Sequence, residues 1–563
     1  MMLLEFIAIL CLLGLTTLGL GWPVAARLGL APGEKLVATL IFSFVALFLL
    51  GGITYLAAWP PLTLTLAPLL ALAGLLLNFR AFIAVLRDPT VRALLLAQLL
   101  VTAWCLGWLS LVASYSGGGW TGDWFEHWER ARFWLDHGPL DQRFLGAYAL
   151  PARPPLANLV TATFLALTRD DFAHYQIIST FFASLAFLPA ALLAHRFGGL
   201  RAIALLAAVF AVSPLFVQNA TFAWTKLPAA CWVLSALYFF LRTLDAAPPR
   251  AAPALFATSL ATGLLVHYSA GPAAVVLAGA WLACGWPRRR EAAWWRMTAV
   301  AALIGTLILA PWFAWSLAHY GVGGTFLSNS SVRAPATQSG SQLLKIILNL
   351  FDTLVPHFLR PLDPALIAQR NPWGAVRDWF FQLYQLNLFF ACGSVAAFAL
   401  VREAWRAARA AKPAIRLGWA LALAALVFLS VGVHGERDHW GVTHICLQSF
   451  VLLTLAFLAA RWPALTRPWR IALVAGAGFD FSAGIALHFA AQNFALDRWF
   501  ARGADPTATY TGYNESALMN LAAKIQHQLA FLADQPPLPP ALALTFLAVI
   551  LVLMIARARS AAP

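Results

Sequence analysis

One segment of the chain carries carboxylates, imidazoles and a guanidinium at helical spacing. Residues 123–138 read DWFEHWERARFWLDHG, and at 3.6 residues per turn one face of the predicted helix carries Asp123, Glu126, His127, Arg130 and His137. A carboxylate that is partly removed from water has a raised pKa and can accept a proton from a hydroxyl or amine nucleophile. The segment is therefore the first candidate for acid–base chemistry, with Asp123 as its leading residue.

The rest of this helix has simpler interpretations. Its second face is apolar and contains Trp124, Trp128, Ala131 and Leu135. Such a helix is expected to lie in a membrane interface, with its tryptophans at headgroup depth. The remaining charges, on Glu129, Arg132 and Asp136, are expected to be solvated surface groups. An apolar stretch follows at 156–168, which is too short to span comfortably and is expected to lie at the interface or to dip into it.

Basic and hydrogen-bonding side chains at the ends of apolar segments form a second group of candidates. They are Arg153, Lys226, His267, Tyr268, Arg437, His439 and His444. Guanidinium groups bind phosphate through paired hydrogen bonds, and lysine does so as a point charge. Lys226 has an alternative interpretation as a snorkelling residue at a span end. The loop HGERDHW (434–440) could equally be a local salt-bridge knot, or a weak metal site through its histidines.

These residues must be positioned by membrane-spanning helices. The chain has 563 residues, of which 61% are hydrophobic and only 11% charged, a balance too apolar for a water-soluble surface. Stretches of about 20 apolar residues recur along it, and they predict about fifteen spans. One of them contains Asp480, a carboxylate that needs a partner or a proton there and that is either structural or a proton relay. The predicted fold class is an all-α polytopic membrane protein.

The net charge of +15 has a topological explanation. Basic clusters at 288–290 and 402–416 fall in short loops on one side of the predicted membrane, which marks that side as cytoplasmic. The N-terminus is then outside and the C-terminus cytoplasmic, as in a multi-pass protein of a plasma or inner membrane. The charge is not gathered on one surface for nucleic acid, so no nucleic-acid partner is expected.

The predicted organisation places function outside the cell or in the periplasm, because the long loops lie there. We expect extra transmembrane helices at 1–92, a catalytic core at 93–316 that includes the extracytoplasmic loop 116–175, and an extracytoplasmic loop with a mobile segment at 317–379. The final region, 380–563, is expected to hold further transmembrane helices and an extracytoplasmic loop at 490–538.

The order of several short motifs resembles that of the GT-C glycosyltransferases, a superfamily that includes protein O-mannosyltransferases and lipid A aminoarabinose transferases. After the acidic helix come Asp-His-Gly (136–138), Arg-Pro-Pro-Leu (153–156), His-Arg-Phe-Gly-Gly (195–199), Ala-Trp-Thr-Lys-Leu-Pro (223–228), Ala-Leu-Tyr-Phe-Phe-Leu-Arg (236–242) and Gly-Leu-Leu-Val-His-Tyr (263–268). The resemblance covers about residues 93–285. It implies a GT-C-like transmembrane bundle with interfacial helices in the first extracytoplasmic loop.

The resemblance also implies a chemistry. The early acid of the family's loop is the catalytic base or a metal-associated acid, and it corresponds to Asp123 here, with Glu126 as partner. The substrate would be a polyprenyl-phosphate-linked sugar, transferred with inversion to a lipid, glycan or protein acceptor on the extracytoplasmic side. A divalent ion such as magnesium or manganese would, if present, be held by Asp123 and Glu126; the family has both metal-dependent and metal-independent members.

Two other classes of function remain open from the sequence. A transporter or flippase of a lipid-linked saccharide is expected to have ionisable residues within its spans and an inverted repeat, and only Asp480 meets that expectation clearly. Another envelope-glycan polymerase or ligase would share the outside loops and the basic phosphate sites.

Overall fold

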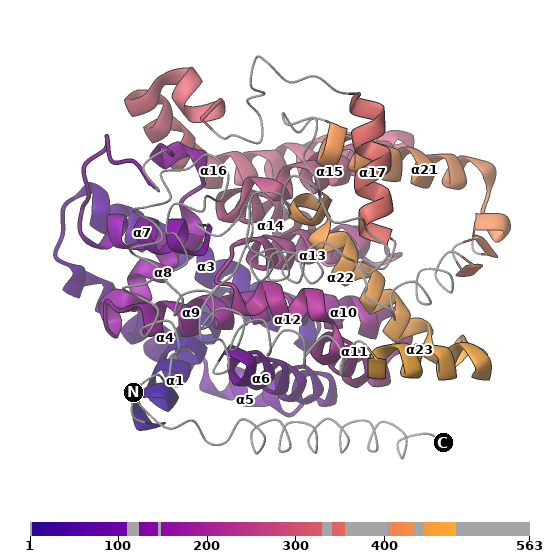
Figure 1. The fold of residues 1–563 in the computed structure, drawn as a ribbon, viewed down its shortest axis with the longest axis horizontal. Coiled ribbons are helices and arrows are strands. Elements are labelled where there is room, and N and C mark those ends of the chain that lie inside the picture. The colour runs from indigo at the N-terminus through magenta and orange to yellow at the C-terminus, as the bar shows by residue number, and fades with distance from the viewer. Residues whose placement is uncertain are drawn as a thin grey trace, which may run out of the picture.

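The computed structural model describes residues 3–109, 123–144, 148–328, 341–354, 402–403, 405–406, 408–432 and 443–479, and all statements below concern these residues. They form helices and no regular strand, which confirms the predicted all-α class within the described ranges (Figure 1). Seven of these helices are long and apolar enough to cross a membrane, or nine if two bent pairs are counted as spans. The predicted spans at 380–401 and 539–556 lie outside the described residues, as does the part of the predicted span 471–489 that begins at Asp480.

The helices follow one another with short connections. The N-terminal elements are α1 (Leu3–Gly19), α2 (Trp22–Ala25), α3 (Pro32–Leu56), η1 (Pro61–Thr65), α4 (Leu66–Leu77), α5 (Phe79–Leu86) and α6 (Pro89–Leu109). The middle elements are α7 (Asp123–Leu135), η3 (Leu150–Ala152), α8 (Leu156–Leu167), α9 (Phe172–Ser184), α10 (Phe187–Gly198), α11 (Leu200–Val212), α12 (Pro214–Thr221), α13 (Lys226–Thr243), α14 (Ala252–Val266), η4 (Tyr268–Ala270), α15 (Gly271–Gly285), η5 (Trp286–Arg288) and α16 (Ala292–Phe326). The last described elements are α17 (Gln342–Leu354), α21 (Pro413–Val427), η7 (Phe428–Gly432), α22 (Thr443–Arg461), η8 (Trp462–Ala464) and α23 (Arg467–Phe479).

The centre of the bundle is formed by α13 and α14, which pack against each other (Figure 1). α10 and α22 pack against α13, and α16 packs against α14. At the left-hand end of the bundle in Figure 1 lie α7 and α8, which also contact each other. α13 and α14 are antiparallel neighbours joined by a short turn at 244–251, so the amino end of α13 and the carboxyl end of α14 lie at the same end of the bundle. α7 lies at this end as well.

The loop 116–175 contains the two helices that the sequence predicts, and both pack into the protein. α8 corresponds to the apolar stretch 156–168, and its side chains from Leu156 to Leu165 are buried among α3, α7, α9 and α14. α7 is also packed into the protein, and even Trp134 on it is only 8% exposed. Its solvated edge carries Arg132 and Asp136, as the sequence indicated. Both helices therefore act as internal parts of the bundle that hold side chains in place.

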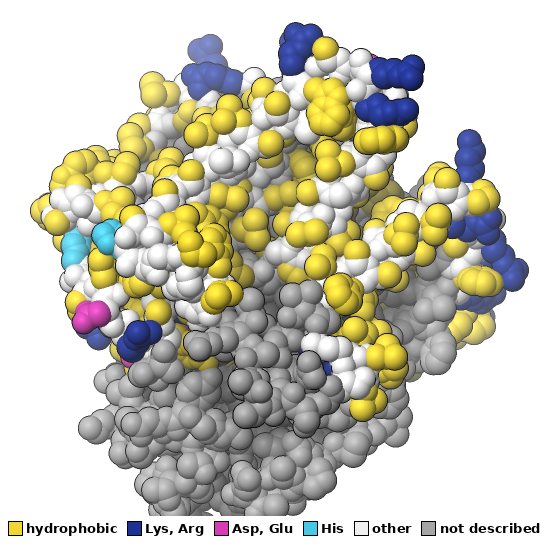
Figure 2. Space-filling view, turned by 90° about the horizontal axis from the view of Figure 1, so that it is seen from above, with side chains coloured by type: hydrophobic (Ala, Val, Ile, Leu, Met, Phe, Trp, Pro, Cys, Tyr) yellow, Lys and Arg dark blue, Asp and Glu magenta, His cyan; other side chains and the backbone are white. Residues whose placement is uncertain are grey.

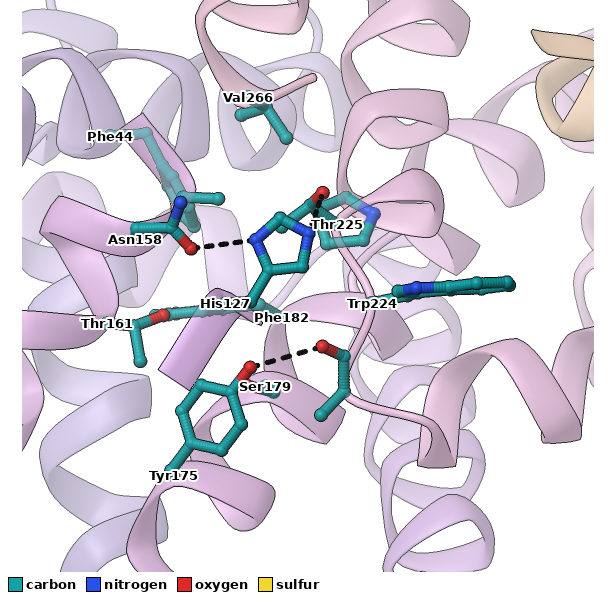
Figure 3. A pocket seen from close by; sticks show the side chains of 13 residues that line it. Phe44, His127, Asn158, Thr161, Tyr175, Ser179, Phe182, Trp224, Thr225 and Val266 are labelled. Carbon is teal, nitrogen blue, oxygen red and sulfur yellow. Dashed lines mark hydrogen bonds between the residues drawn. The ribbon is translucent and has the colours of Figure 1, made fainter. Parts of the chain in front are cut away.

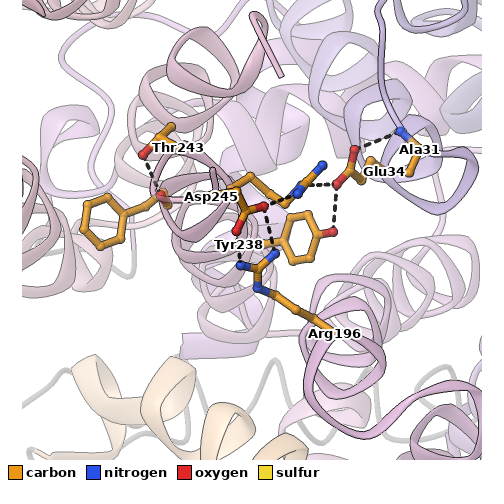
Figure 4. Close-up of polar contacts among 8 residues, drawn as sticks. Ala31, Glu34, Arg196, Tyr238, Thr243 and Asp245 are labelled. Atoms are coloured by element: carbon orange, nitrogen blue, oxygen red, sulfur yellow. Dashed lines mark hydrogen bonds and ion pairs between the residues drawn. The ribbon is translucent and has the colours of Figure 1, made fainter. Parts of the chain in front are cut away.

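α3 connects the N-terminal helices to the predicted core. It contacts α6, α8, α10 and α14 along its length. At its amino end, Glu34 is buried and bonds to Tyr238 and Arg242 of α13 (Figure 4). Asp245 extends this network by pairing with Arg242 and with Arg196 of α10. This polar network therefore holds α3, α10 and α13 together at the carboxyl end of α13. By helix rise, that end lies about 24 Å from Lys226 at the amino end of the same helix.

A close approach between α3 and α8 can be tested with two adjacent glycines. We expect Gly51→Ala to lower the free energy of unfolding by about 1–3 kcal/mol, because its Cβ would collide with Leu159 Cδ2 and lie 3.1 Å from Leu159 Cγ. Gly52→Ala is the matched control, since a Cβ there has no atom within 4 Å. The measurement is the unfolding temperature of each variant in detergent. Equal unfolding temperatures of the two variants would show that α3 and α8 are not packed as described.

The outer surface is suited to a lipid environment. α16 and α21 expose large apolar side chains: Val300, Leu303, Leu307, Leu417, Trp419 and Leu421. In the space-filling view, hydrophobic side chains cover much of the described face, while most Lys and Arg side chains lie along its upper and right-hand rim (Figure 2). An apolar belt with basic groups displaced to its edge is the surface expected of a membrane protein.

Candidate functional site

The ionisable face of α7 is directed into the protein. Glu126 and Arg130 are fully buried and His127 is 4% exposed. Arg130 is held on all sides: it donates to Glu126 Oε1 at 2.8 Å and to the carbonyl oxygens of Leu150 and Ala149 at 2.7 and 3.1 Å. Residues four apart share a helix face, so Glu126 and Arg130 meet without distorting α7. Arg130 therefore ties α7 to the η3 turn, where the Arg-Pro-Pro motif begins.

Glu126 lies between two guanidinium groups. Its Oε2 atom is 3.1 Å from Nη2 of Arg153, and its Oε1 atom bonds to Arg130. Burial alone would raise the pKa of the Glu126 carboxyl, but the charges of Arg153 and Arg130 outweigh it and hold the pKa well below its usual value. Glu126 is therefore an ionised counter-ion that positions Arg153. These contacts show Glu126 as the ion-pair partner of two arginines. Its role as a base or metal ligand stays a prediction from the sequence.

His127 is a neutral imidazole with a defined tautomer. Burial lowers its pKa to about 3, and the nearby arginines oppose protonation further. Its Nδ1 atom lies 3.0 Å from Asn158 Oδ1, and its Nε2 atom lies 3.3 Å from Thr225 Oγ1 (Figure 3). The amide oxygen carries no proton, so Nδ1 donates to Asn158 and Nε2 accepts from the Thr225 hydroxyl. His127 thus joins α7 to α8 and to the segment before α13.

Lys226 is presented by a strained turn. Ala223 has φ of 57°, a left-handed conformation that is unfavourable for alanine, and Tyr175 of α9 donates a hydrogen bond to its carbonyl at 3.3 Å. Strain of this kind persists where the surrounding structure holds it in place. The turn leads to Lys226 at the first residue of α13, where its Nζ atom lies 3.1 Å from the ring centroid of Trp224. Lys226 is 4% exposed, so it points inward and is not a snorkelling residue.

His267 and Tyr268 complete the site from the end of α14. The chain becomes extended at His267, and its Nδ1 atom accepts a hydrogen bond from the Ser269 amide at 3.0 Å. The neutral ring consequently carries its proton on Nε2, where it can act as a donor. The Tyr268 hydroxyl donates to Pro151 O at 3.3 Å and lies 3.4 Å from Trp312 Nε1. Both residues therefore stand beside the turn that carries Arg153.

Arg153 and Lys226 both lie within electrostatic range of His267, and we call these three residues the cationic cluster. They come from three segments: the η3 turn, the amino end of α13 and the carboxyl end of α14. Arg153 is held in place by Glu126, and its guanidinium lies over the Tyr148 ring. Two positive charges and one N–H donor at one place form a suitable site for an anionic ligand such as a phosphate.

The structure unites five of the nine site residues predicted from the sequence: Glu126, Arg153, Lys226, His267 and Tyr268. Asp123 is the first residue of α7, three residues before Glu126, but its side chain lies outside the described residues. The same holds for the side chain of His444 in α22, and for Arg437 and His439 altogether. Their roles stay predictions.

Sequence reasoning assigned no task to Arg130, His127, Asn158 or Thr225. Arg130 and His127 were placed on the ionisable face of α7, and the structure gives them their contacts. A signal was available for Asn158, since it is the single amide in the otherwise apolar or hydroxyl-bearing helix LANLVTATFLAL. An amide buried in such a helix needs a partner.

A metal site was a further expectation. Within the described residues, no three His, Cys, Asp or Glu side chains are grouped as metal ligands would be. Glu126 faces two arginines rather than other carboxylates. The side chain of Asp123, the other predicted ligand, lies outside the described residues, so a magnesium or manganese ion held by Asp123 and Glu126 stays a prediction.

Comparisons with known proteins were made for sequence and for structure. No family model and no curated protein matches the chain. Two solved structures are similar in fold: ArnT from Cupriavidus metallidurans bound to undecaprenyl phosphate, and the same protein in the apo state. For the bound form of ArnT, the sequence identity is 16% and the TM-score is 0.45, and the alignment covers 77% of this chain and 75% of ArnT. For the apo form, the identity is 16% and the TM-score is 0.43, and the alignment covers 76% of this chain and 75% of ArnT. The likeness concerns the arrangement of helices.

Proposed function

We propose that the chain is a membrane glycosyltransferase that transfers a sugar from a polyprenyl-phosphate-linked donor to an acceptor on the extracytoplasmic side, with inversion. The observation that supports this proposal is the cationic cluster at helix ends that the sequence assigns to the outside. Arg153 and Lys226 are 12% and 4% exposed, so their charges act where water is largely excluded. Fixed charges in such a site stabilise a developing anion far more than the same charges in water.

The proposed reaction is a single displacement at the anomeric carbon. Asp123 accepts the proton of the acceptor's hydroxyl or amine group, and that nucleophile forms its bond to the anomeric carbon. The bond from this carbon to the phosphate oxygen breaks at the same time, and the phosphate leaves with the bonding electron pair. Arg153, Lys226 and the Nε2–H of His267 stabilise the leaving phosphate. Glu126 keeps Arg153 in position, and Arg130 keeps Glu126 in position.

A phosphate group provides the common chemistry between this cluster and the expected donor. The related fold of ArnT has been solved with undecaprenyl phosphate, a ligand of the same class as the donor proposed here. Mobile hydrocarbon tails of such a lipid would remain in the bilayer beside the apolar outer surface. The sugar next to the phosphate would then reach the interior between α7, α8 and α13.

The product distinguishes this function from the transporter alternative. Purified protein in liposomes is given polyprenyl-phosphate-linked sugars from outside together with envelope glycolipids, and the products are analysed by mass. We expect an acceptor that gains the mass of one sugar residue, with release of polyprenyl phosphate. A flippase would move the lipid between leaflets with no change in mass, and a polymerase or ligase would transfer more than one residue; either result would reject the proposal.

A further inference from the structure

A small buried pocket lies on the side of His127 that faces α8 and α9, and we call it the His127 pocket (Figure 3). Its polar walls are formed by His127, Asn158, Thr161, Ser179 and Thr225. Its apolar walls are mainly aromatic and are formed by Phe44, Tyr175, Phe182 and Trp224. None of the described residues that line it carries a charge, since His127 is neutral.

Three polar groups of this pocket are available for a ligand. The Asn158 amide nitrogen and the hydroxyls of Thr161 and Ser179 have no hydrogen-bond partner among the described residues, although these residues are only 4%, 5% and 9% exposed. Buried polar groups in native proteins almost always have a partner, either in the protein, in ordered water or in a ligand. These three converge from α8 and α9 on one small space, which makes that space suitable for a polar group.

The position of the pocket connects it to the proposed donor. Thr225 lines the pocket and Lys226, the next residue, belongs to the cationic cluster. The sugar of the donor is bonded directly to the phosphate, so its substituents come within reach of the pocket when the phosphate is bound. The free space admits about one or two non-hydrogen atoms, which is too little for a sugar ring.

We infer that the His127 pocket receives the hydroxymethyl group of a neutral hexose on the donor, and that it thereby sets which sugar is transferred. The inference rests on the proposed function. The methylene carbon would contact the aromatic walls, and the hydroxyl would bond to Asn158, Thr161 or Ser179. A carboxylate or an ammonium group at the same position would lose its water without gaining a counter-charge from any lining residue. α3 takes part through Phe44, so the N-terminal helices contribute to specificity.

The test compares three polyprenyl-phosphate-linked donors that differ only at this position: a hexose, the matching pentose without the hydroxymethyl group, and the matching uronic acid. For the wild type we expect kcat/KM to be highest with the hexose, by about tenfold or more over the pentose, because a site built for a polar group discriminates against its absence. We expect the uronic acid to be the poorest donor, since its charge cannot be compensated in the pocket.

Two pocket variants and a matched control complete the test. Thr161→Val should lower kcat/KM for the hexose several-fold more than for the pentose. Thr161→Leu, which fills the pocket, should reverse the preference toward the pentose. Thr163→Val is the control on the same helix, because the Thr163 hydroxyl already bonds to Leu159 O at 3.0 Å. It should keep the wild-type ratio between donors. Thermal unfolding of each variant shows that it is folded.

The outcomes separate this inference from the proposed function. If sugars are transferred but the hexose has no advantage, or if Thr161→Val lowers all donors equally, the pocket holds structural water and the inference is wrong while the function stands. If no donor of any kind is consumed, the proposed function fails and the inference fails with it.

Discussion

Glu126→Gln is expected to destabilise the folded protein by about 3–5 kcal/mol, because it removes the carboxylate between two buried guanidinium groups. Arg130 is fully buried, and it would keep its bonds to Leu150 and Ala149 but lose the carboxylate that forms an ion pair with it. An uncompensated charge in such a place is far more costly than the loss of a surface ion pair. The measurement is unfolding of purified protein in detergent by heat or denaturant.

An exposed pair supplies the control for this variant. Glu291 pairs with Arg288 at 2.9 Å, but both side chains are about half exposed, so Glu291→Gln should change stability by less than about 1 kcal/mol. The double variant Glu126→Gln with Arg130→Met should be less destabilised than the sum of the single variants, since it removes the charge that is left unpaired. Additive effects, or a loss at Glu126 no larger than at Glu291, would show that the two buried residues are not coupled.

Asp123→Asn is expected to lower the rate of sugar transfer by roughly 100- to 10,000-fold, the range found for the loss of a general base. Asparagine has nearly the same shape as aspartate but cannot accept the proton of the nucleophile. The Michaelis constant for the donor should change little, because the phosphate is held by Arg153 and Lys226 and not by Asp123. The measurement is a transfer assay under single-turnover conditions.

Asp136→Asn is the matched control for this variant. Asp136 follows α7, and its carboxylate is 55% exposed and pairs with Arg132 at the protein surface. Its replacement should leave the transfer rate within about twofold of the wild type, as expected for an exposed ion pair. Full transfer activity in Asp123→Asn, or an equal loss in both variants, would reject Asp123 as the base.

The sequence determines much of this architecture through local patterns. Apolar stretches mark the membrane helices, and the 3.6-residue period correctly groups Glu126, His127 and Arg130 on one face of α7. Arg153, Lys226 and His267 could be predicted as candidate phosphate ligands because they are basic side chains at the ends of apolar segments. These features depend on neighbours in the chain, so they are visible without a structure.

The parts that could not be predicted depend on contacts between distant segments. α8 has the length and composition of an interfacial helix, and only the structure shows that α3, α7 and α9 pack around it. The approach of Gly51 to Leu159 and the contact of Phe44 with the His127 pocket likewise join residues more than 80 positions apart. The ion pairs of Glu126 with Arg130 and Arg153 likewise depend on the fold, while its predicted role as a second acid stays a prediction.

If Arg153 and Lys226 bind the phosphate of a polyprenyl lipid, as we propose, undecaprenyl phosphate should bind to the purified protein in detergent. We expect saturable binding by the wild type, and binding about 10- to 100-fold weaker in Lys226→Met, because one charge-assisted interaction is lost. Lys35→Met, which removes a cation at the opposite end of the bundle that bonds to Ala26 O, should bind like the wild type. Absence of binding by the wild type, or unchanged binding by Lys226→Met, would show that the cationic cluster is not the phosphate site.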